Sequence, residues 1–77
     1  MKVKVIVTLK KGVLDPQGKA IQQTLNGMDF PEVNQIRQGK YFDIEVSIED
    51  EKKAKAKVEE MCKKLLANLV IEDYKIL

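Results

Sequence analysis

The stretch Lys10–Gly18, which reads Lys-Lys-Gly-Val-Leu-Asp-Pro-Gln-Gly, comes nearest to a chemical motif in this sequence. A loop that leads into a helix presents free backbone N–H groups, and these can bind a phosphate. Here Asp15 would occupy that anion site itself, and the spacing of a Walker A loop is absent. Three interpretations are open for the stretch: a phosphate site, a close contact with another part of the fold or another molecule, or a simple helix cap.

Asp15 and Pro16 predict the start of a helix. An aspartate carboxylate caps free N–H groups of the first turn, and proline suits the position that follows. Gly18 would lie in that first turn, where glycine costs about 1 kcal/mol relative to alanine. We therefore expect another part of the fold, or another molecule, to approach the backbone closely at Gly18. Gly12 lies where a strand must turn, and we expect it to adopt a positive φ.

The composition disfavours an enzyme that acts alone. The 77 residues include no histidine, so the usual general base, the usual zinc ligand and any histidine-activated nucleophile are missing. Cys62 is the only cysteine, which excludes an internal disulfide and a cysteine metal cluster. It lies on the apolar stripe of a predicted helix, where we expect a buried and inert thiol. The sequence predicts no catalytic residue, no metal and no cofactor.

The charge balance indicates neither a nucleic-acid nor a membrane partner. Fourteen basic residues against twelve acidic ones leave a net charge of +2. Tyr41 and Phe42 would point to opposite faces of one strand, which does not suit an RNA-binding sheet. No stretch has the roughly 20 apolar residues that span a bilayer, and the N-terminus does not resemble a signal peptide. We expect a cytoplasmic protein.

Hydrophobic periodicity divides the chain into six elements. Alternation predicts strands and a 3.6-residue period predicts helices, with glycine and proline marking their ends. Gly39 is expected to form the turn of a hairpin between two of the strands. The expected elements are a strand over 2–10, a helix over 16–27, a weaker strand over 32–38, a strand over 41–48, a helix from 50 to about 68, and a strand over 69–77.

This order, β-α-β-β-α-β, predicts an α+β ferredoxin-like fold for a single domain, 1–77. The four strands would form an antiparallel sheet in the order 4-1-3-2, with both helices on one face. The other face would be uncovered and partly apolar, which suits self-association of a chain too short to bury a large core. Its candidate residues are Ile6, Thr8, Tyr41 and Asp43.

Three stretches together resemble the PurS family, the small subunit of phosphoribosylformylglycinamidine synthase. They are Leu9–Gly18, Ile36–Lys40 (Ile-Arg-Gln-Gly-Lys) and Met61–Tyr74 (Met-Cys-Lys-Lys-Leu-Leu-Ala-Asn-Leu-Val-Ile-Glu-Asp-Tyr), in this order and spacing. The resemblance implies a non-catalytic subunit in the fourth step of purine biosynthesis. Its partners would be a large ATP-dependent synthetase subunit and a glutaminase subunit, which it would join while supporting ammonia transfer. It further implies a homodimer or homotetramer.

The resemblance implies contacts with partner subunits, and the two conspicuous loops supply the candidates for them. One is the loop before the first helix and the other is the expected hairpin tip. The candidates are Lys11, Gly12, Leu14, Asp15, Gly18, Arg37, Gly39 and Lys40.

Two other classes share the expected fold. A regulatory domain of the ACT type would bind an amino acid, and an acylphosphatase-like enzyme would need an arginine in the first loop. The only basic residues of that loop are lysines. The ACT-like domain is therefore the main alternative function.

Overall fold

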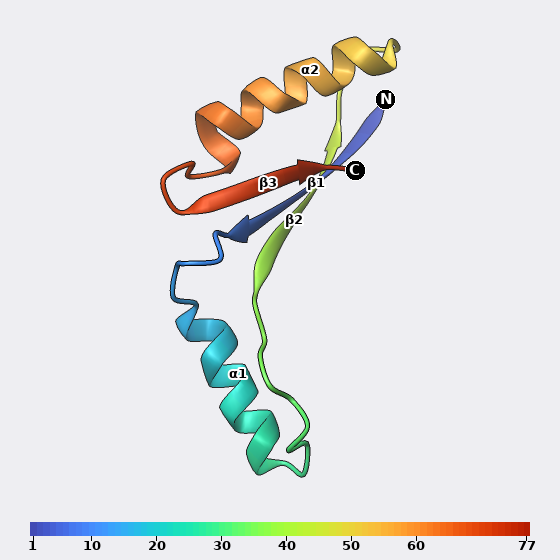
Figure 1. Cartoon of the computed structure of the whole chain (residues 1–77). Coiled ribbons are helices and arrows are strands. Elements are labelled where there is room, and N and C mark those ends of the chain that lie inside the picture. The colour runs from blue at the N-terminus through green and yellow to red at the C-terminus, as the bar shows by residue number, and fades with distance from the viewer.

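A three-stranded antiparallel sheet, covered on one face by a single helix, forms the body of the molecule (Figure 1). The computed structural model describes all residues from 1 to 77. The strand order is β2-β1-β3, so the first strand is central. The elements in chain order are β1 (Lys2–Leu9), α1 (Pro16–Gly27), β2 (Gly39–Glu45), α2 (Glu51–Met61), the π-helical turn η1 (Cys62–Leu66) and β3 (Glu72–Ile76).

The alternation of β1 places its valines in the core. Val3, Val5 and Val7 are buried, and Val5 lies opposite Phe42 of β2 and Ile76 of β3. Successive side chains of a strand point to opposite faces, so the residues between these valines lie on the open face. The core therefore forms between the β1 valines and the helix that covers them.

The helix over the sheet is α2. Asp50 caps it, because its carboxylate accepts a hydrogen bond of 3.1 Å from the Lys53 N–H. Ala54, Val58 and Cys62 follow at intervals of four residues, and all three are fully buried. The turn then widens in η1, where the Ala67 N–H donates to the Cys62 carbonyl at 2.9 Å. The expected second helix is confirmed, although it ends at Leu66.

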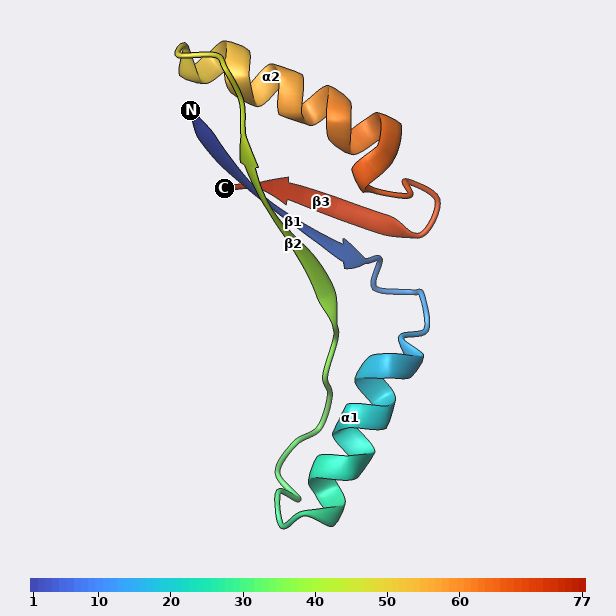
Figure 2. The same ribbon diagram turned by 180° about the vertical axis from the view of Figure 1, so that it is seen from behind.

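The first helix does not cover the sheet. Helix α1 spans the expected residues, but it points away from the body, and the segment 28–38 returns beside it (Figures 1 and 2). We call α1 and this returning segment the arm. Gly18 is the only buried residue of α1. The molecule measures 48 × 24 × 14 Å and is elongated.

The four-stranded ferredoxin-like sheet predicted from the sequence is therefore wrong. Residues 32–38 form no strand. Only one of the two helices, α2, lies on a face of the sheet. Asn26 explains part of the difference, because its side-chain amide donates to the carbonyls of Phe30 and Val33 at 3.0 and 3.1 Å. These bonds hold the returning segment against the end of α1 and away from the sheet.

Two strand ends also differ from the expectation. Gly39 forms no hairpin tip, because it is the first residue of β2 and lies opposite Thr8 of β1. The last strand starts at Glu72 because Asn68 accepts backbone bonds from Ile71 and Glu72, which makes a turn there. Strands β1 and β2 are thus antiparallel neighbours, and the whole arm is inserted between them.

The structure holds no helix with the length and apolar character needed to cross a membrane.

Candidate functional site: the neck of the arm

The two loops that the sequence singled out meet at one place. The chain enters the arm through residues 10–18 and leaves it through residues 36–40, and we call this junction the neck (Figure 1). The neck lies between the end of β1 and the beginning of β2. Local signals in the sequence marked each loop separately, and the fold brings them together.

Asp15 is the central residue of the neck. It is only 6% exposed, and one carboxylate oxygen accepts from the Gly18 N–H at 2.8 Å. The other oxygen accepts from the Gln38 N–H at 2.7 Å, across 23 residues of sequence. The hydrogen bonds from Gly18 and Gln38 hold the pKa of the Asp15 carboxyl below its usual value, because they stabilise the charged form. The predicted helix cap is confirmed, and it has a second partner.

The close approach expected at the backbone of Gly18 is present in the structure. A Cβ at this position would overlap the Ile36 carbonyl oxygen, and it would also crowd the Asp15 carboxylate. The close neighbour is thus another part of the fold. The expectation for Gly12 is wrong, since no glycine in the chain has a positive φ. Asp29, at the far end of the arm, has a φ of 72° instead.

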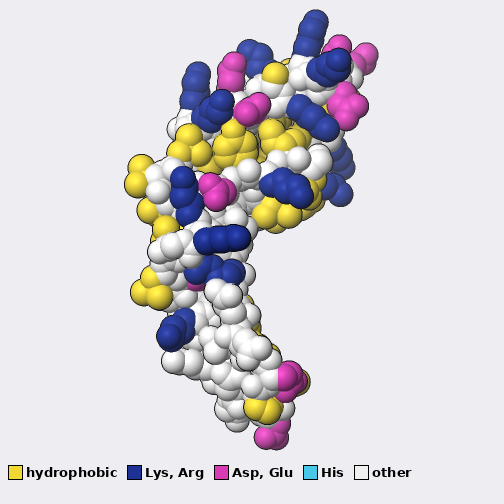
Figure 3. Space-filling model, viewed as in Figure 1, with side chains coloured by type: hydrophobic (Ala, Val, Ile, Leu, Met, Phe, Trp, Pro, Cys, Tyr) yellow, Lys and Arg dark blue, Asp and Glu magenta, His cyan; other side chains and the backbone are white.

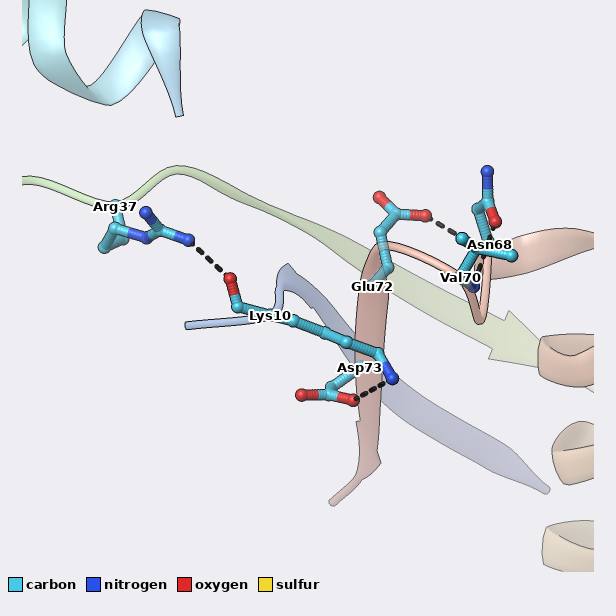
Figure 4. Close-up of polar contacts among 6 residues, drawn as sticks. All are labelled: Lys10, Arg37, Asn68, Val70, Glu72 and Asp73. Atoms are coloured by element: carbon cyan, nitrogen blue, oxygen red, sulfur yellow. Dashed lines mark hydrogen bonds and ion pairs between the residues drawn. The ribbon is translucent and has the colours of Figure 1, made fainter. Parts of the chain in front are cut away.

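Arg37 binds the other side of the neck (Figure 4). Its guanidinium donates to the Lys10 carbonyl at 2.9 Å. The Lys10 N–H donates in turn to the Ile71 carbonyl at 2.9 Å, and the Lys10 ammonium lies 3.9 Å from the Asp73 carboxylate. The backbone of Lys10 is thereby fixed between the arm and the turn before β3.

Lys40 and Glu72 connect the neck to the third strand. Their charged groups lie 3.8 Å apart, one on β2 and one on β3, across the end of β1. The second oxygen of Glu72 accepts from the Asn68 N–H at 2.7 Å. A pocket of about 200 Å³ lies here, with Val7 and Leu9 beside Asp15, Lys40 and Glu72 among its lining residues.

The eight predicted contact residues have different places in this site. Asp15 and Gly18 are buried, whereas Gly39 is exposed, although a Cβ at Gly39 would crowd the Val7 carbonyl and the Thr8 side chain. Arg37 and Lys40 are exposed but have the partners described above. The remaining three, Lys11, Gly12 and Leu14, are exposed on the loop before α1. Contact with a partner remains a prediction for all eight.

The open face of the sheet holds the four residues predicted for self-association. Ile6 lies opposite Tyr41, and Asp43 lies opposite Lys4, while Thr8 lies opposite Gly39. Ile6 is half-buried and Tyr41 is exposed, so this pair forms the apolar centre of the face. Self-association through this face stays a prediction.

Sequence reasoning missed the neck residues that act through their backbone. Gln38 contributes its N–H and Lys10 its carbonyl, and a side-chain pattern carries no signal for either. Glu72 and Asp73 offered only a weak signal, as two adjacent carboxylates at the start of a strand. The structure has no group of three or more histidine, cysteine or acidic side chains placed to bind a metal.

Comparisons with known proteins agree over nearly the whole chain. The family model for PurS, described as phosphoribosylformylglycinamidine (FGAM) synthase, matches residues 2–77. The phosphoribosylformylglycinamidine synthase subunit PurS of Methanocaldococcus jannaschii is 53% identical over 75 residues, which cover 97% of this chain and 90% of that protein. The Bacillus subtilis subunit is 51% identical over 74 residues, which cover 96% and 87% of the two chains.

Solved structures are similar as well. The crystal structure of M. jannaschii PurS has a TM-score of 0.88, and the match covers 99% of this chain and 92% of that one. A chain in the structure of PurLQS from Thermotoga maritima has a TM-score of 0.90 at 33% identity, with 99% and 93% covered. The ACT-like and acylphosphatase-like alternatives depended on a four-stranded sheet, and the three-stranded sheet removes their basis.

Proposed function

The chain belongs to the PurS family of phosphoribosylformylglycinamidine synthase subunits in purine biosynthesis, and from this we propose that it is the connecting subunit. In this role it would join the glutaminase subunit to the large ATP-dependent subunit and support ammonia transfer between them. The relative in PurLQS is similar over nearly its full length, which supports a place in an assembly of this kind.

The main observation that supports this proposal is the large exposed surface area of the chain. The chain exposes 5983 Å², whereas a compact monomer of its mass, 8.8 kDa, exposes about 4,800 Å². The excess of roughly 1,200 Å² is larger than the approximately 800 Å² that each partner buries in an interface of standard size. The Cα radius of gyration is 15.9 Å, against about 11–12 Å for a compact chain of this length. Such a shape suits a subunit that contacts others.

Apolar side chains lie on separate parts of this surface. Leu65 and Val70, near the turn between α2 and β3, are 83% and 82% exposed. Met28 and Phe30 are exposed at the far end of the arm. Figure 3 shows hydrophobic groups along the side where the α2–β3 turn and the loop before α1 lie. More than one apolar region fits a chain that contacts more than one partner.

The chemistry of the side chains fits an accessory subunit. The sequence has no histidine, and burial raises the pKa of the Cys62 thiol, which keeps it in the unreactive neutral form. The carboxylate of Asp15 and the guanidinium of Arg37 bind backbone groups of the neck. We infer that catalysis belongs to the other subunits.

Reconstitution with the glutaminase and large subunits tests the connecting role. Synthase activity would be measured with glutamine and, separately, with ammonium chloride as the nitrogen source. We expect glutamine-dependent activity to need this chain and ammonium-dependent activity of the large subunit to persist without it. Equal glutamine-dependent activity in its presence and absence would contradict the proposal.

Self-association is a second part of the proposal, with a second copy of the chain seated on the open sheet face. The Ile6–Tyr41 pair would form the centre of the interface, and charges of both signs surround it, including Lys4 and Asp43. Light scattering at micromolar concentration is expected to give at least twice the mass of one chain. The Tyr41→Lys variant should shift the mass toward the monomer, whereas the Lys55→Gln variant on α2 should not.

A further inference from the structure

The second hydrogen bond of Asp15 is more than a helix cap requires. Asp50, which caps α2, uses one oxygen to accept from the Lys53 N–H and makes no bond to a distant segment. Asp15 makes the equivalent bond to Gly18 and a further one to Gln38. A carboxylate has two acceptor oxygens and can bind both donors at once.

The two donors lie on the two different chain segments that form the neck. Gly18 lies in the first turn of α1, so it moves with the arm. Gln38 precedes Gly39, which lies opposite Thr8 in the sheet. Gln38 is the last residue of the arm, and the residue that follows it is fixed by pairing in the sheet. The Asp15 carboxylate joins the base of the helix to the edge of the body.

The surroundings leave the carboxylate little freedom. Asp15 is almost fully buried, and the Ile36 carbonyl lies directly against Gly18. On the other side of the neck, Arg37 binds the Lys10 carbonyl, and Lys10 is bonded to the turn before β3. Helix α1 makes no large contact with the sheet, so its direction depends on these few bonds.

We propose that Asp15 is a positioning residue that fixes the angle between the arm and the sheet. Its two oxygens hold the first turn of α1 and Gln38, the residue before β2, at one separation. The apolar side chains of the arm are thereby presented at a set place relative to the open sheet face. The proposal concerns the free chain and does not depend on the partners it meets in the synthase.

The Asp15→Asn variant tests this directly. Asparagine remains a good cap, but it has one acceptor oxygen, and its amide group would face the second donor N–H. Spin labels on Gln23→Cys in α1 and Lys57→Cys in the middle of α2 report the angle of the arm, and both sites are exposed. Cys62 is buried, and a chain with Cys62 alone checks that it stays unlabelled. Excess unlabelled chain removes distances between copies.

We expect a single narrow distance distribution for the parent chain and a distribution at least twofold broader for Asp15→Asn, with the circular dichroism of the folded chain retained. The matched control is Asp50→Asn, which alters the cap of α2 and should leave the width unchanged. Equal widths in the parent and Asp15→Asn chains, or equal broadening in the control, would overturn the proposal.

A second variant reaches the same bond from the other side. Gln38→Pro removes the donor N–H and leaves the Asp15 cap intact. It is expected to broaden the distribution to a similar extent, even if Asp15→Asn fails to fold. A narrow distribution in folded Gln38→Pro would show that the bond does not set the angle.

Discussion

The two helices of this protein begin alike and end in different surroundings. Each is about three turns long, and each is capped by an aspartate that accepts from an N–H three residues later. Helix α2 buries Ala54 and Val58 against the sheet and η1 continues with Cys62, whereas α1 buries only Gly18. Both helices thus have an apolar stripe, and the stripe alone does not determine which part of the molecule packs against it.

The difference separates the part of the chain that forms the hydrophobic core from the part whose apolar side chains are exposed to other molecules. The body contains the entire buried hydrophobic cluster, and the arm contains none of it. Loss of an apolar group on α2 should therefore be measured as a loss of stability. Loss of one on α1 should be measured mainly in association.

Exchanging an apolar residue for aspartate on each helix should give the largest contrast. Val58→Asp places an unpaired carboxylate in a fully buried position, and we expect a loss above about 4 kcal/mol and no cooperative melting transition. Ile21→Asp alters a side chain of α1 that is already 43% exposed. It should keep the melting transition and weaken binding to the other subunits. Thermal melting and copurification measure the two effects, and equal loss of stability in both variants would remove the distinction.

Alanine substitutions at two glycines of α1 should change the free energy of unfolding by smaller amounts and in opposite directions. Gly18→Ala would drive a methyl group into the Ile36 carbonyl, and we expect a net loss of about 1–2 kcal/mol despite the better helix propensity of alanine. Gly27→Ala meets no atom within 4 Å and needs no positive φ, so it should stabilise the chain by up to about 1 kcal/mol. Urea unfolding measures both. A Gly18→Ala chain as stable as the Gly27→Ala chain would mean that the neck adjusts freely.

The acid dependence of Asp15 should give the smallest effect. Its pKa is lowered from 3.8 in the folded chain, so its stabilisation is complete above about pH 4 and is lost as the pH falls through the lowered value. The melting temperature of the parent chain should exceed that of Asp15→Asn by a few degrees at pH 6, and this gap should narrow below pH 4. Melting curves from pH 6 to pH 2.5 measure it. A gap that stays constant to the lowest pH would exclude a role for the carboxylate charge.

The sequence predicts the local structure better than the arrangement of its parts. The β1 alternation, the Asp-Pro start of α1 and the buried stripe of α2 depend on neighbouring residues, and all three predictions are confirmed. The direction of α1 depends on bonds between residues far apart, such as Asp15 and Gln38, which no period can reveal. Gly18 signalled a close contact, but the partner is a backbone carbonyl and has no residue-type signature. The strand predicted over 32–38 is wrong, and part of the reason is a side-chain bond from Asn26 to the Val33 carbonyl, which holds this segment beside α1.

The insertion of the arm between two paired strands has a consequence for how the chain is built. Strands β1 and β2 form a β-hairpin whose connection happens to be the arm, since Thr8 pairs with Gly39. A two-residue Asn-Gly turn could in principle close the same hairpin. The longer connection raises the loop-closure entropy that folding must overcome by only roughly 2 kcal/mol, because this term grows with the logarithm of length. Loop-closure entropy therefore permits an arm of a different length on the same pair of strands, whereas Asp15, Gly18 and Gln38 constrain the residues at its base.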